Sequence, residues 1–201
     1  RVSATAFHQF VNIFKNNEPF LLDLELDLAG AYQVFNLPGV LKVLDCLQRE
    51  GLSFDEEKTR AGLRQVKLMT GLKGRWQQLH EHPLIICDTG HNISGIQVIL
   101  AQLETLPHKH VHFVFGAVND KDISDILNLL PKHYTYYFCQ AAIPRALPVE
   151  ELVLKSKEAG LKGKAYPTVA KAIKAAKANA APDDVIFIGG STFVVAEIED
   201  L

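Results

Sequence analysis

Residues 88–92, Asp-Thr-Gly-His-Asn, bring a carboxylate, an imidazole and an amide together directly after the apolar run LIIC. The Asp88 carboxylate could accept hydrogen bonds from ribose hydroxyls or hold a cation. The His91 imidazole could bind an anion or handle a proton near neutral pH, and Gly90 allows a backbone to come close to a ligand. A plainer interpretation is that Asp88 ends a strand and Asn92 caps the next helix. Both interpretations predict a strand-to-helix turn, and the first makes it a ligand site.

Three further loops carry polar groups just after apolar runs. Ser191 follows two glycines and could offer its hydroxyl and helix N-terminal amides to an anion, or it could simply cap a helix. Arg145 lies in a loop after a proline, where a guanidinium could clamp a carboxylate in bidentate fashion. Asp122, in Asp-Lys-Asp 120–122, could serve a ligand or cap the helix that starts at Ile123.

Three histidines, His108, His110 and His112, alternate along one expected strand and raise the question of a metal site. They lie at the start of that strand, away from the end where ligands bind, and no acidic partner is near them in the sequence. We interpret them as surface histidines and expect no metal ligands in this chain.

After residue 74, short apolar runs alternate with amphipathic segments. The runs predict strands at 84–88, 111–116, 134–139 and 185–189. The segments between and after them predict helices at 92–105, 122–131, 149–160 and 168–179, with a last helix after Ser191. This alternation predicts an α/β fold with a mostly parallel, doubly wound sheet and flanking helices. Because ligands bind beyond the carboxyl ends of such strands, the four loops above form the expected site.

The first third of the chain has a different rhythm. Residues 20–28 alternate around Leu22, Leu24, Leu26 and Leu28, which is the period of a half-buried strand. Helices are expected near 37–50, ending at Gly51, and at 55–66, where Ser53 or Asp55 would be the cap. The glycine-containing stretch at 70–75 interrupts the pattern, so we expect a domain boundary between residues 73 and 74.

Composition excludes several classes of protein. The chain of 201 residues is 48% hydrophobic and 22% charged, with a net charge of -2, so it has no bulk charge that would attract nucleic acid or an anionic membrane. It has no apolar run of the roughly 18 residues that span a bilayer, and no signal peptide is visible. Its three cysteines have no metal-ligand spacing, and two lie in apolar runs, which indicates reduced core thiols and a cytoplasmic protein.

The order of the motifs resembles that of folylpolyglutamate and dihydrofolate synthases, a branch of the Mur ligase superfamily. Gly74-Arg75, followed after twelve residues by Asp88–Asn92, is similar to the segment that opens the C-terminal domain of that family. The matches that follow the same order are Gly30-Ala31-Tyr32-Gln33 with Asn36, Phe115-Gly116 with Asp120-Lys121-Asp122, Pro144-Arg145-Ala146, and Gly190-Ser191 with Glu197. Thr89-Gly90 and Ile93 depart from the usual Gly-Ala and Pro of the family.

The resemblance implies a division of the chain. A P-loop of the form G-x-x-x-x-G-K-[ST] is not found in the sequence, which begins at Arg1 rather than Met. We therefore expect the C-terminal portion of a longer enzyme, inactive alone. Residues 1–73 would be the tail of the central ATP-binding domain, and residues 74–201 would be the Rossmann-like C-terminal domain.

The resemblance also implies a reaction. Such enzymes use MgATP to phosphorylate a carboxylate of folate or dihydropteroate, and the amine of L-glutamate then attacks the acyl phosphate. In this chain Asn36 would contact adenine, Arg75 the ATP phosphates and Asp88 the ribose. His91 would be the catalytic residue, beside the transferring phosphoryl group or the incoming amine.

The remaining implications concern substrate and assembly. Ser191 and Arg145 would bind substrate, with Ser191 assigned to glutamate, and the Mg²⁺ ligands would lie outside this chain. The expected partners are ATP, L-glutamate and folate or dihydropteroate, with no nucleic acid or membrane, for a cytoplasmic monomer.

Three alternatives stay open. A sister ligase that adds amino acids to a UDP-muramyl precursor would use the same chemistry, although Asn92 favours the folate branch. A dinucleotide-binding oxidoreductase would need G-x-G-x-x-G after its first strand, and LIICDTGHN lacks it. A non-catalytic nucleotide-binding module of Rossmann-like fold would carry the same C-terminal sequence.

Overall fold

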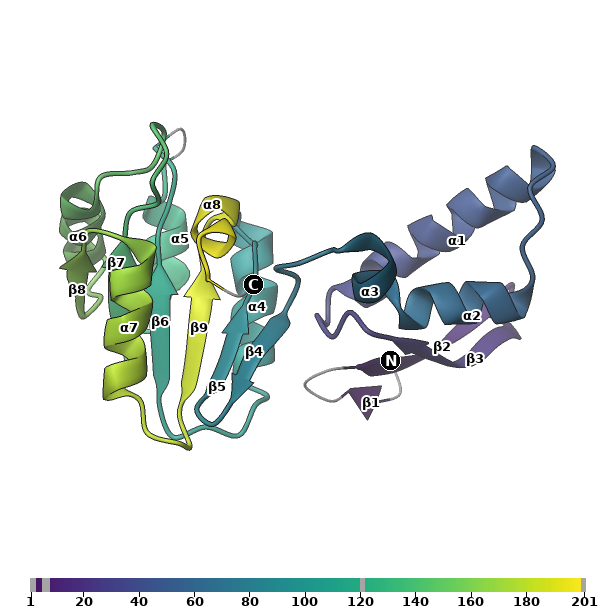
Figure 1. Cartoon of the computed structure of the whole chain (residues 1–201), viewed down its shortest axis with the longest axis horizontal. Helices are drawn as coiled ribbons and strands as arrows, with labels where there is room; N and C mark the ends of the chain where they lie inside the picture. The colour runs from purple at the N-terminus through teal and green to yellow at the C-terminus, as the bar shows by residue number, and fades with distance from the viewer. Residues whose placement is uncertain (1–2, 5–7, 120–121, 200–201) are drawn as a thin grey trace. The chain divides into compact units, whose positions relative to one another are not determined.

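The computed structural model describes residues 3–4, 8–119 and 122–199. The chain divides after Arg75 into two compact units, unit 1 (residues 1–75) and unit 2 (residues 76–201) (Figure 1). The division lies close to the boundary expected after residue 73. Each unit has a sheet of its own, and each is described separately below.

Unit 1 contains a three-stranded antiparallel sheet in the order β1-β2-β3, formed by β1 (Ser3–Ala4), β2 (Gln9–Lys15) and β3 (Glu18–Leu26). Asn16 and Asn17 form the turn between β2 and β3 with φ angles of 53° and 67°. Asparagine tolerates this left-handed region better than most residues, and tight hairpin turns require it.

The alternation expected in β3 is only partly correct. Leu24 and Leu26 are buried as expected, but Leu22 is 43% exposed, and its neighbour Leu21 is buried instead. The reason is an irregularity in the hairpin: Asp23 has a φ of 51°, and the pairing register shifts between Val11 and Ile13. Such a bulge places an extra residue in one strand and reverses the face that the preceding side chains occupy.

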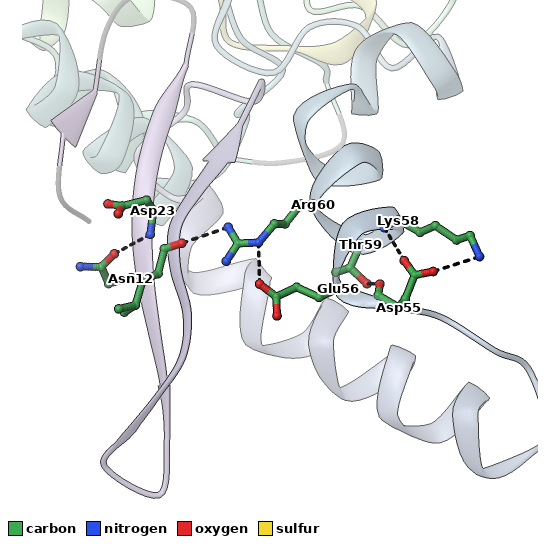
Figure 2. A network of polar contacts seen from close by, with 8 residues as sticks. Asn12, Asp23, Asp55, Glu56, Lys58, Thr59 and Arg60 are labelled. Atoms are coloured by element: carbon green, nitrogen blue, oxygen red, sulfur yellow. Dashed lines mark hydrogen bonds and ion pairs between the residues drawn. The ribbon is translucent and has the colours of Figure 1, made fainter.

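Three helices complete the description of unit 1: α1 (Gln33–Arg49), α2 (Glu56–Arg64) and α3 (Val66–Thr70). Asp55 caps α2, because its carboxylate accepts a hydrogen bond of 2.7 Å from the Lys58 amide. Figure 2 shows how Arg60 joins this helix to the hairpin: its guanidinium donates to Glu56 at 2.8 Å and to the carbonyl oxygen of Leu22 at 2.9 Å. The bulge at Asp23 is held in the same network, since the Asp23 amide donates to Asn12.

Unit 2 contains a six-stranded sheet in the order β4-β5-β9-β6-β7-β8. Its strands are β4 (Gln77–Glu81), β5 (Leu84–Cys87), β6 (Val111–Phe115), β7 (Thr135–Cys139), β8 (Gly163–Tyr166) and β9 (Val185–Gly189). All neighbours are parallel except β4, which pairs antiparallel with β5. The mostly parallel α/β sheet predicted from the sequence is therefore confirmed. The two edge strands, β4 and β8, were not predicted.

Helices cover both faces of this sheet. They are α4 (Ile93–Leu103), α5 (Ser124–Leu129), α6 (Val149–Glu158), α7 (Val169–Asn179) and α8 (Thr192–Ala196). In Figure 1, α7 and α8 lie in front of the strands, and α4 and α5 lie behind them. Within the described part of the chain, no helix combines the length and the apolar character that crossing a membrane requires.

Candidate functional site

The loops singled out in the sequence meet at one edge of the unit 2 sheet. Strands β5, β6, β7 and β9 are parallel neighbours or near neighbours, so their carboxyl ends lie together. The loops that follow them begin at Asp88, Gly116, Gln140 and Gly190. Gly190 has a φ of 91°, and a Cβ atom there would lie 2.7 Å from the carbonyl oxygen of Gly116. Glycine is therefore what lets the loops after β6 and β9 approach each other.

Asp88 is buried at this edge, with only 1% of its surface exposed. Its Oδ1 accepts a hydrogen bond of 2.8 Å from the Gly90 amide, and its Oδ2 accepts one of 2.7 Å from the Trp76 amide. Its own amide donates to Ile188 of the neighbouring strand β9. Both oxygens of the carboxylate expected at the ribose thus accept backbone amides, one from its own loop and one from Trp76.

His91 is exposed, and its Nδ1 lies 3.0 Å from the carbonyl oxygen of Thr89. A carbonyl oxygen can only accept, so in the neutral ring Nδ1 carries the proton and Nε2 keeps its lone pair. The imidazole therefore presents a basic nitrogen at the carboxyl edge of the sheet. Asn92 caps α4 by accepting a hydrogen bond of 2.7 Å from the Gly95 amide, which confirms the structural interpretation of that residue.

A pocket of about 360 Å³ lies beside His91. Three of the four loops contribute to it: the loop after β5, the loop after β6 and the loop after β9. The polar side chains lie within residues 91–94 and at Asp122. The apolar lining comes mainly from the end of β6 and from residues 117, 118 and 123, which follow it. The lining residues are His91, Asn92, Ile93, Ser94, Phe115, Ala117, Val118, Asp122, Ile123, Ile126 and Gly190.

Ser191 and Arg145 do not line this pocket; both contact Phe193 of α8. Ser191 is 3% exposed, and its hydroxyl accepts a hydrogen bond of 3.2 Å from the Phe193 amide, so it caps α8. The Arg145 guanidinium lies over the Phe193 ring, 4.9 Å from its centre. The loop of Arg145 is also tied to α8 by Glu197, whose carboxylate accepts a hydrogen bond from the Ala142 amide.

The Asp-Lys-Asp segment is described only at its last residue, because Asp120 and Lys121 lie outside the described residues. Asp122 accepts hydrogen bonds from the hydroxyl and the amide of Ser124, at 2.7 and 2.9 Å. These two bonds lower the pKa of its carboxyl group. Asp122 is therefore an anionic group on the pocket wall, and it stabilises the start of α5.

Asn36 and Arg75 belong to unit 1. Asn36 is exposed on α1, where its amide donates to Gln33 at 2.8 Å. Arg75 is exposed and is the last residue of unit 1. Of the residues expected at the site, unit 2 gathers Asp88, His91, Ser191 and Arg145 at its carboxyl edge.

Of the three histidines expected at the surface, His112 in β6 is buried, and His108 and His110 before it are partly buried. His112 is 5% exposed; its Nε2 lies 3.3 Å from the Asp184 carboxylate, and its Nδ1 lies 2.9 Å from the Tyr137 hydroxyl. His110 is partly buried against Thr135. The expectation of no acidic partner was wrong. Asp184 is 72 residues away in the sequence, but it directly precedes β9, the strand next to β6.

The described residues do not offer an obvious metal site. Across residues 3–4, 8–119 and 122–199, no three side chains from among His, Cys, Asp and Glu gather closely enough to hold an ion. Cys87 and Cys139 are free and buried, as predicted for core thiols, and burial raises the pKa of each to about 12.

Two residues of the site were missed by sequence reasoning. Trp76 donates its backbone amide to Asp88, and Phe193 supports Arg145. Trp76 could have been noticed because it is the only tryptophan in the chain and directly follows Gly74-Arg75. Phe193 stands two residues after Ser191 and shows no comparable signal.

Comparison with known proteins places the chain in a family. The profile described as Mur ligase, glutamate ligase domain, matches residues 74–192. A curated relative from Haloferax volcanii, named "Probable bifunctional folylpolyglutamate synthase/dihydropteroate synthase", is 31% identical over 94% of this chain and 22% of its own length. The dihydrofolate synthase/folylpolyglutamate synthase of Escherichia coli is 30% identical over 82% of this chain and 37% of its own length.

Solved structures agree with the sequence relatives. Escherichia coli FolC in complex with ADP is 26% identical, with a TM-score of 0.73 over 94% of this chain and 44% of that one. A bifunctional folylpolyglutamate synthase/dihydrofolate synthase with Mn, AMPPNP and L-glutamate bound is 27% identical, with a TM-score of 0.64 over 76% of this chain and 36% of that one. This chain thus spans less than half the length of these relatives. The match of the glutamate ligase domain profile over residues 74–192 shows that the chain belongs to the Mur ligase family.

Proposed function

We propose that this chain is the C-terminal portion of an ATP-dependent ligase that adds L-glutamate to folate or dihydropteroate through an acyl phosphate. The observation that carries the proposal is the pocket at the carboxyl edge of unit 2, where the loop of His91 meets the loop of Gly190. In this family the matching domain is described as a glutamate ligase domain, and a related enzyme has been solved with AMPPNP and L-glutamate bound.

The chemistry requires two bond exchanges. A free carboxylate is a poor acyl donor, so a phosphoryl group is first transferred from ATP to a carboxylate oxygen, and ADP leaves. The glutamate nitrogen then attacks the carbonyl carbon, the amide bond forms, and phosphate leaves with its oxygen. The amine loses a proton in this second step, and the Nε2 lone pair of His91 can take it or can meet the charge that develops nearby.

The substrate contacts are assigned to groups at the same edge. We assign the carboxylates of the incoming glutamate to the Arg145 guanidinium and to the Ser191 segment at the start of α8. An arginine suits this role because its planar fork pairs with a carboxylate through two parallel hydrogen bonds. Phe193 and Glu197 hold the two segments together.

We assign adenine to Asn36, the phosphates to Arg75 and the ribose to Asp88. Asn36 and Arg75 are exposed and present an amide and a guanidinium to solvent, which suits contacts with a polar ligand. No P-loop sequence occurs in this chain, and we assign the P-loop and the Mg²⁺ ligands to other parts of the ligase. Residues 1–73 would then be the end of its ATP-binding domain, and the enzyme would act as a cytoplasmic monomer.

A substrate panel tests the proposal on the complete ligase. ADP release is measured with MgATP, L-glutamate and one acceptor at a time: dihydropteroate, a reduced folate or a UDP-muramyl precursor. We expect turnover that needs both L-glutamate and one of the first two acceptors. Turnover with the UDP-muramyl precursor instead would assign the chain to the sister branch, and ADP release with none of the three would contradict the proposal. The 201-residue chain alone serves as the inactive control.

A further inference from the structure

The segment that leads into unit 2 is fixed at Trp76. The Trp76 side chain is 2% exposed, and its ring lies 6.2 Å from that of Phe187, which is fully buried in β9. The backbone at this point is constrained, because Trp76 has a φ of 49° and Gly74 a φ of 71°. A tryptophan in the left-handed region is unfavourable by itself, so surrounding contacts must hold it there.

Asp88 provides the polar part of that support. Its Oδ2 accepts the Trp76 amide at 2.7 Å in a buried setting, where a hydrogen bond to a charged acceptor is strong. The same carboxylate accepts the Gly90 amide through Oδ1 at 2.8 Å, one residue before His91. The Asp88 backbone is in turn bonded to Ile188 of β9. Asp88 therefore joins Trp76 and the His91 loop through its carboxylate, and the central strand β9 through its backbone amide.

We infer that Asp88 is a positioning residue for Arg75: by holding the Trp76 amide, it fixes the residue that directly follows Arg75 in the chain. The Cα atoms of Arg75 and Trp76 are about 3.8 Å apart across a trans peptide, so a displaced Trp76 displaces Arg75 as well. The inference rests on the proposed function only in giving Arg75 the ATP phosphates. It gives Asp88 a different role from the direct ribose contact assigned above, because Asp88 would act on the nucleotide through another residue. The double-mutant cycle below decides between the two roles.

Amide hydrogen exchange in the ligand-free 201-residue chain tests the anchoring. Asp88→Ala removes both hydrogen bonds, and we expect the Trp76 and Gly90 amides to exchange about tenfold faster or more, the scale of losing a buried bond to a charged acceptor. We expect the emission of Trp76, the only tryptophan in the chain, to become more accessible to acrylamide. Asp88→Asn keeps the size of the side chain but replaces one acceptor oxygen with a donor, so one of the two amides should lose protection.

The matched control is Asp184→Ala in the same unit. Asp184 is also buried and also accepts a backbone amide, that of Ala181, at 2.7 Å. The Asp184→Ala variant should lower the overall stability of unit 2. In that variant the Trp76 amide should remain as protected from hydrogen exchange as the amides of Ile186 and Ile188. Unchanged exchange at Trp76 in Asp88→Ala, or an equal effect of Asp184→Ala there, would overturn the anchoring role whether or not the complete protein is a ligase.

A double-mutant cycle on the complete ligase tests the link to Arg75. The apparent KM for MgATP is measured for Asp88→Asn, Arg75→Ala and the double variant. If Asp88 acts through Arg75, the Asp88→Asn change should alter KM by less than about twofold once Arg75 is already alanine, because the two effects share one route. Effects that multiply independently would assign Asp88 a separate contact, such as the ribose, and would overturn the positioning role.

Discussion

The Arg145 guanidinium lies over the face of Phe193, with 4.9 Å between its central carbon and the centre of the ring. The two residues come from different segments of unit 2: Arg145 lies in the loop before α6, and Phe193 lies in α8, two residues after Ser191. The Arg145 carbonyl oxygen also accepts the Asn119 amide at 2.8 Å, which ties its loop to the one after β6. The side chain proposed to bind the carboxylates of glutamate is thus held beside the helix that Ser191 caps.

Replacing Phe193 with leucine should weaken glutamate binding without unfolding the protein. Leucine keeps an apolar side chain under the guanidinium but removes the ring face, a contact of about 0.5–1 kcal/mol at exposed sites. In the complete ligase, the KM for L-glutamate should rise about two- to fivefold, with little change in the KM for MgATP. Phe14→Leu, at a phenylalanine of unit 1 that is 58% exposed, is the control. Equal glutamate KM values for the two variants would show that Phe193 has no role in holding Arg145.

The same substitution should have opposite effects at two glycines. A Cβ atom at Gly190 would lie 2.5 Å from the Phe115 ring, and an alanine there would have to keep a φ of 91°. Gly190→Ala should therefore destabilise unit 2 by about 1–3 kcal/mol or more. Gly39 lies inside α1 with open space around its Cα, so Gly39→Ala should stabilise unit 1 by roughly 0.5–1 kcal/mol. Both stability changes are measured by urea unfolding, with amide hydrogen exchange as the readout for each unit. A neutral Gly190→Ala would mean that the loops after β6 and β9 need not approach as closely as the structure shows.

Unit 2 should lose stability as the pH falls below about 7 because of His112. Burial lowers the pKa of His112, and the hydrogen bond to Asp184 only partly opposes this shift. In the unfolded chain this histidine titrates near its ordinary value of about 6.5. As the pH falls through that value, the unfolded state therefore binds the proton first, and stability declines until the lower folded-state pKa is passed.

The size of this effect is limited by a single proton. One group can contribute a slope of at most about 1.4 kcal/mol per pH unit. His112→Gln can still donate to Asp184 and accept from Tyr137 but cannot titrate, so it should flatten the pH dependence of the unfolding free energy in this range. His133→Gln, at an exposed histidine, should leave the dependence intact. A dependence that is the same in His112→Gln and wild type would assign it to other groups.

The strands that could be predicted are those whose sequences record their burial. β5, β6, β7 and β9 lie inside the sheet and are covered on both faces, so they read as continuous apolar runs such as LIIC and VIFIG. The edge strands β4, QQLHE, and β8, GKAY, are largely exposed or half-buried and carry no such pattern. Their places are set by pairing with a neighbour, which a single sequence does not display.

The site shows the same limit. Asp88 and His91 could be located because polar residues after a buried parallel strand must emerge at its carboxyl edge. The partner of Asp88 is a backbone amide twelve residues earlier in the chain, and a backbone amide has no residue-type signature. The contact between His112 and Asp184 joins two adjacent strands that are far apart in sequence, so it became visible only in the fold.

The most direct test of the proposed ligase is steady-state kinetics of His91→Ala in the complete enzyme, at saturating MgATP, L-glutamate and folate acceptor. His91 is exposed, and its Nδ1 contacts the Thr89 carbonyl oxygen of its own loop, so the variant should keep a melting temperature close to that of wild type. If His91 handles the proton or charge at the reacting centre, kcat should fall on the order of 10²-fold or more, while His133→Ala should retain full activity. A folded His91→Ala enzyme with kcat within about threefold of wild type, far from the loss of a catalytic group, would contradict the proposed catalytic role of this loop.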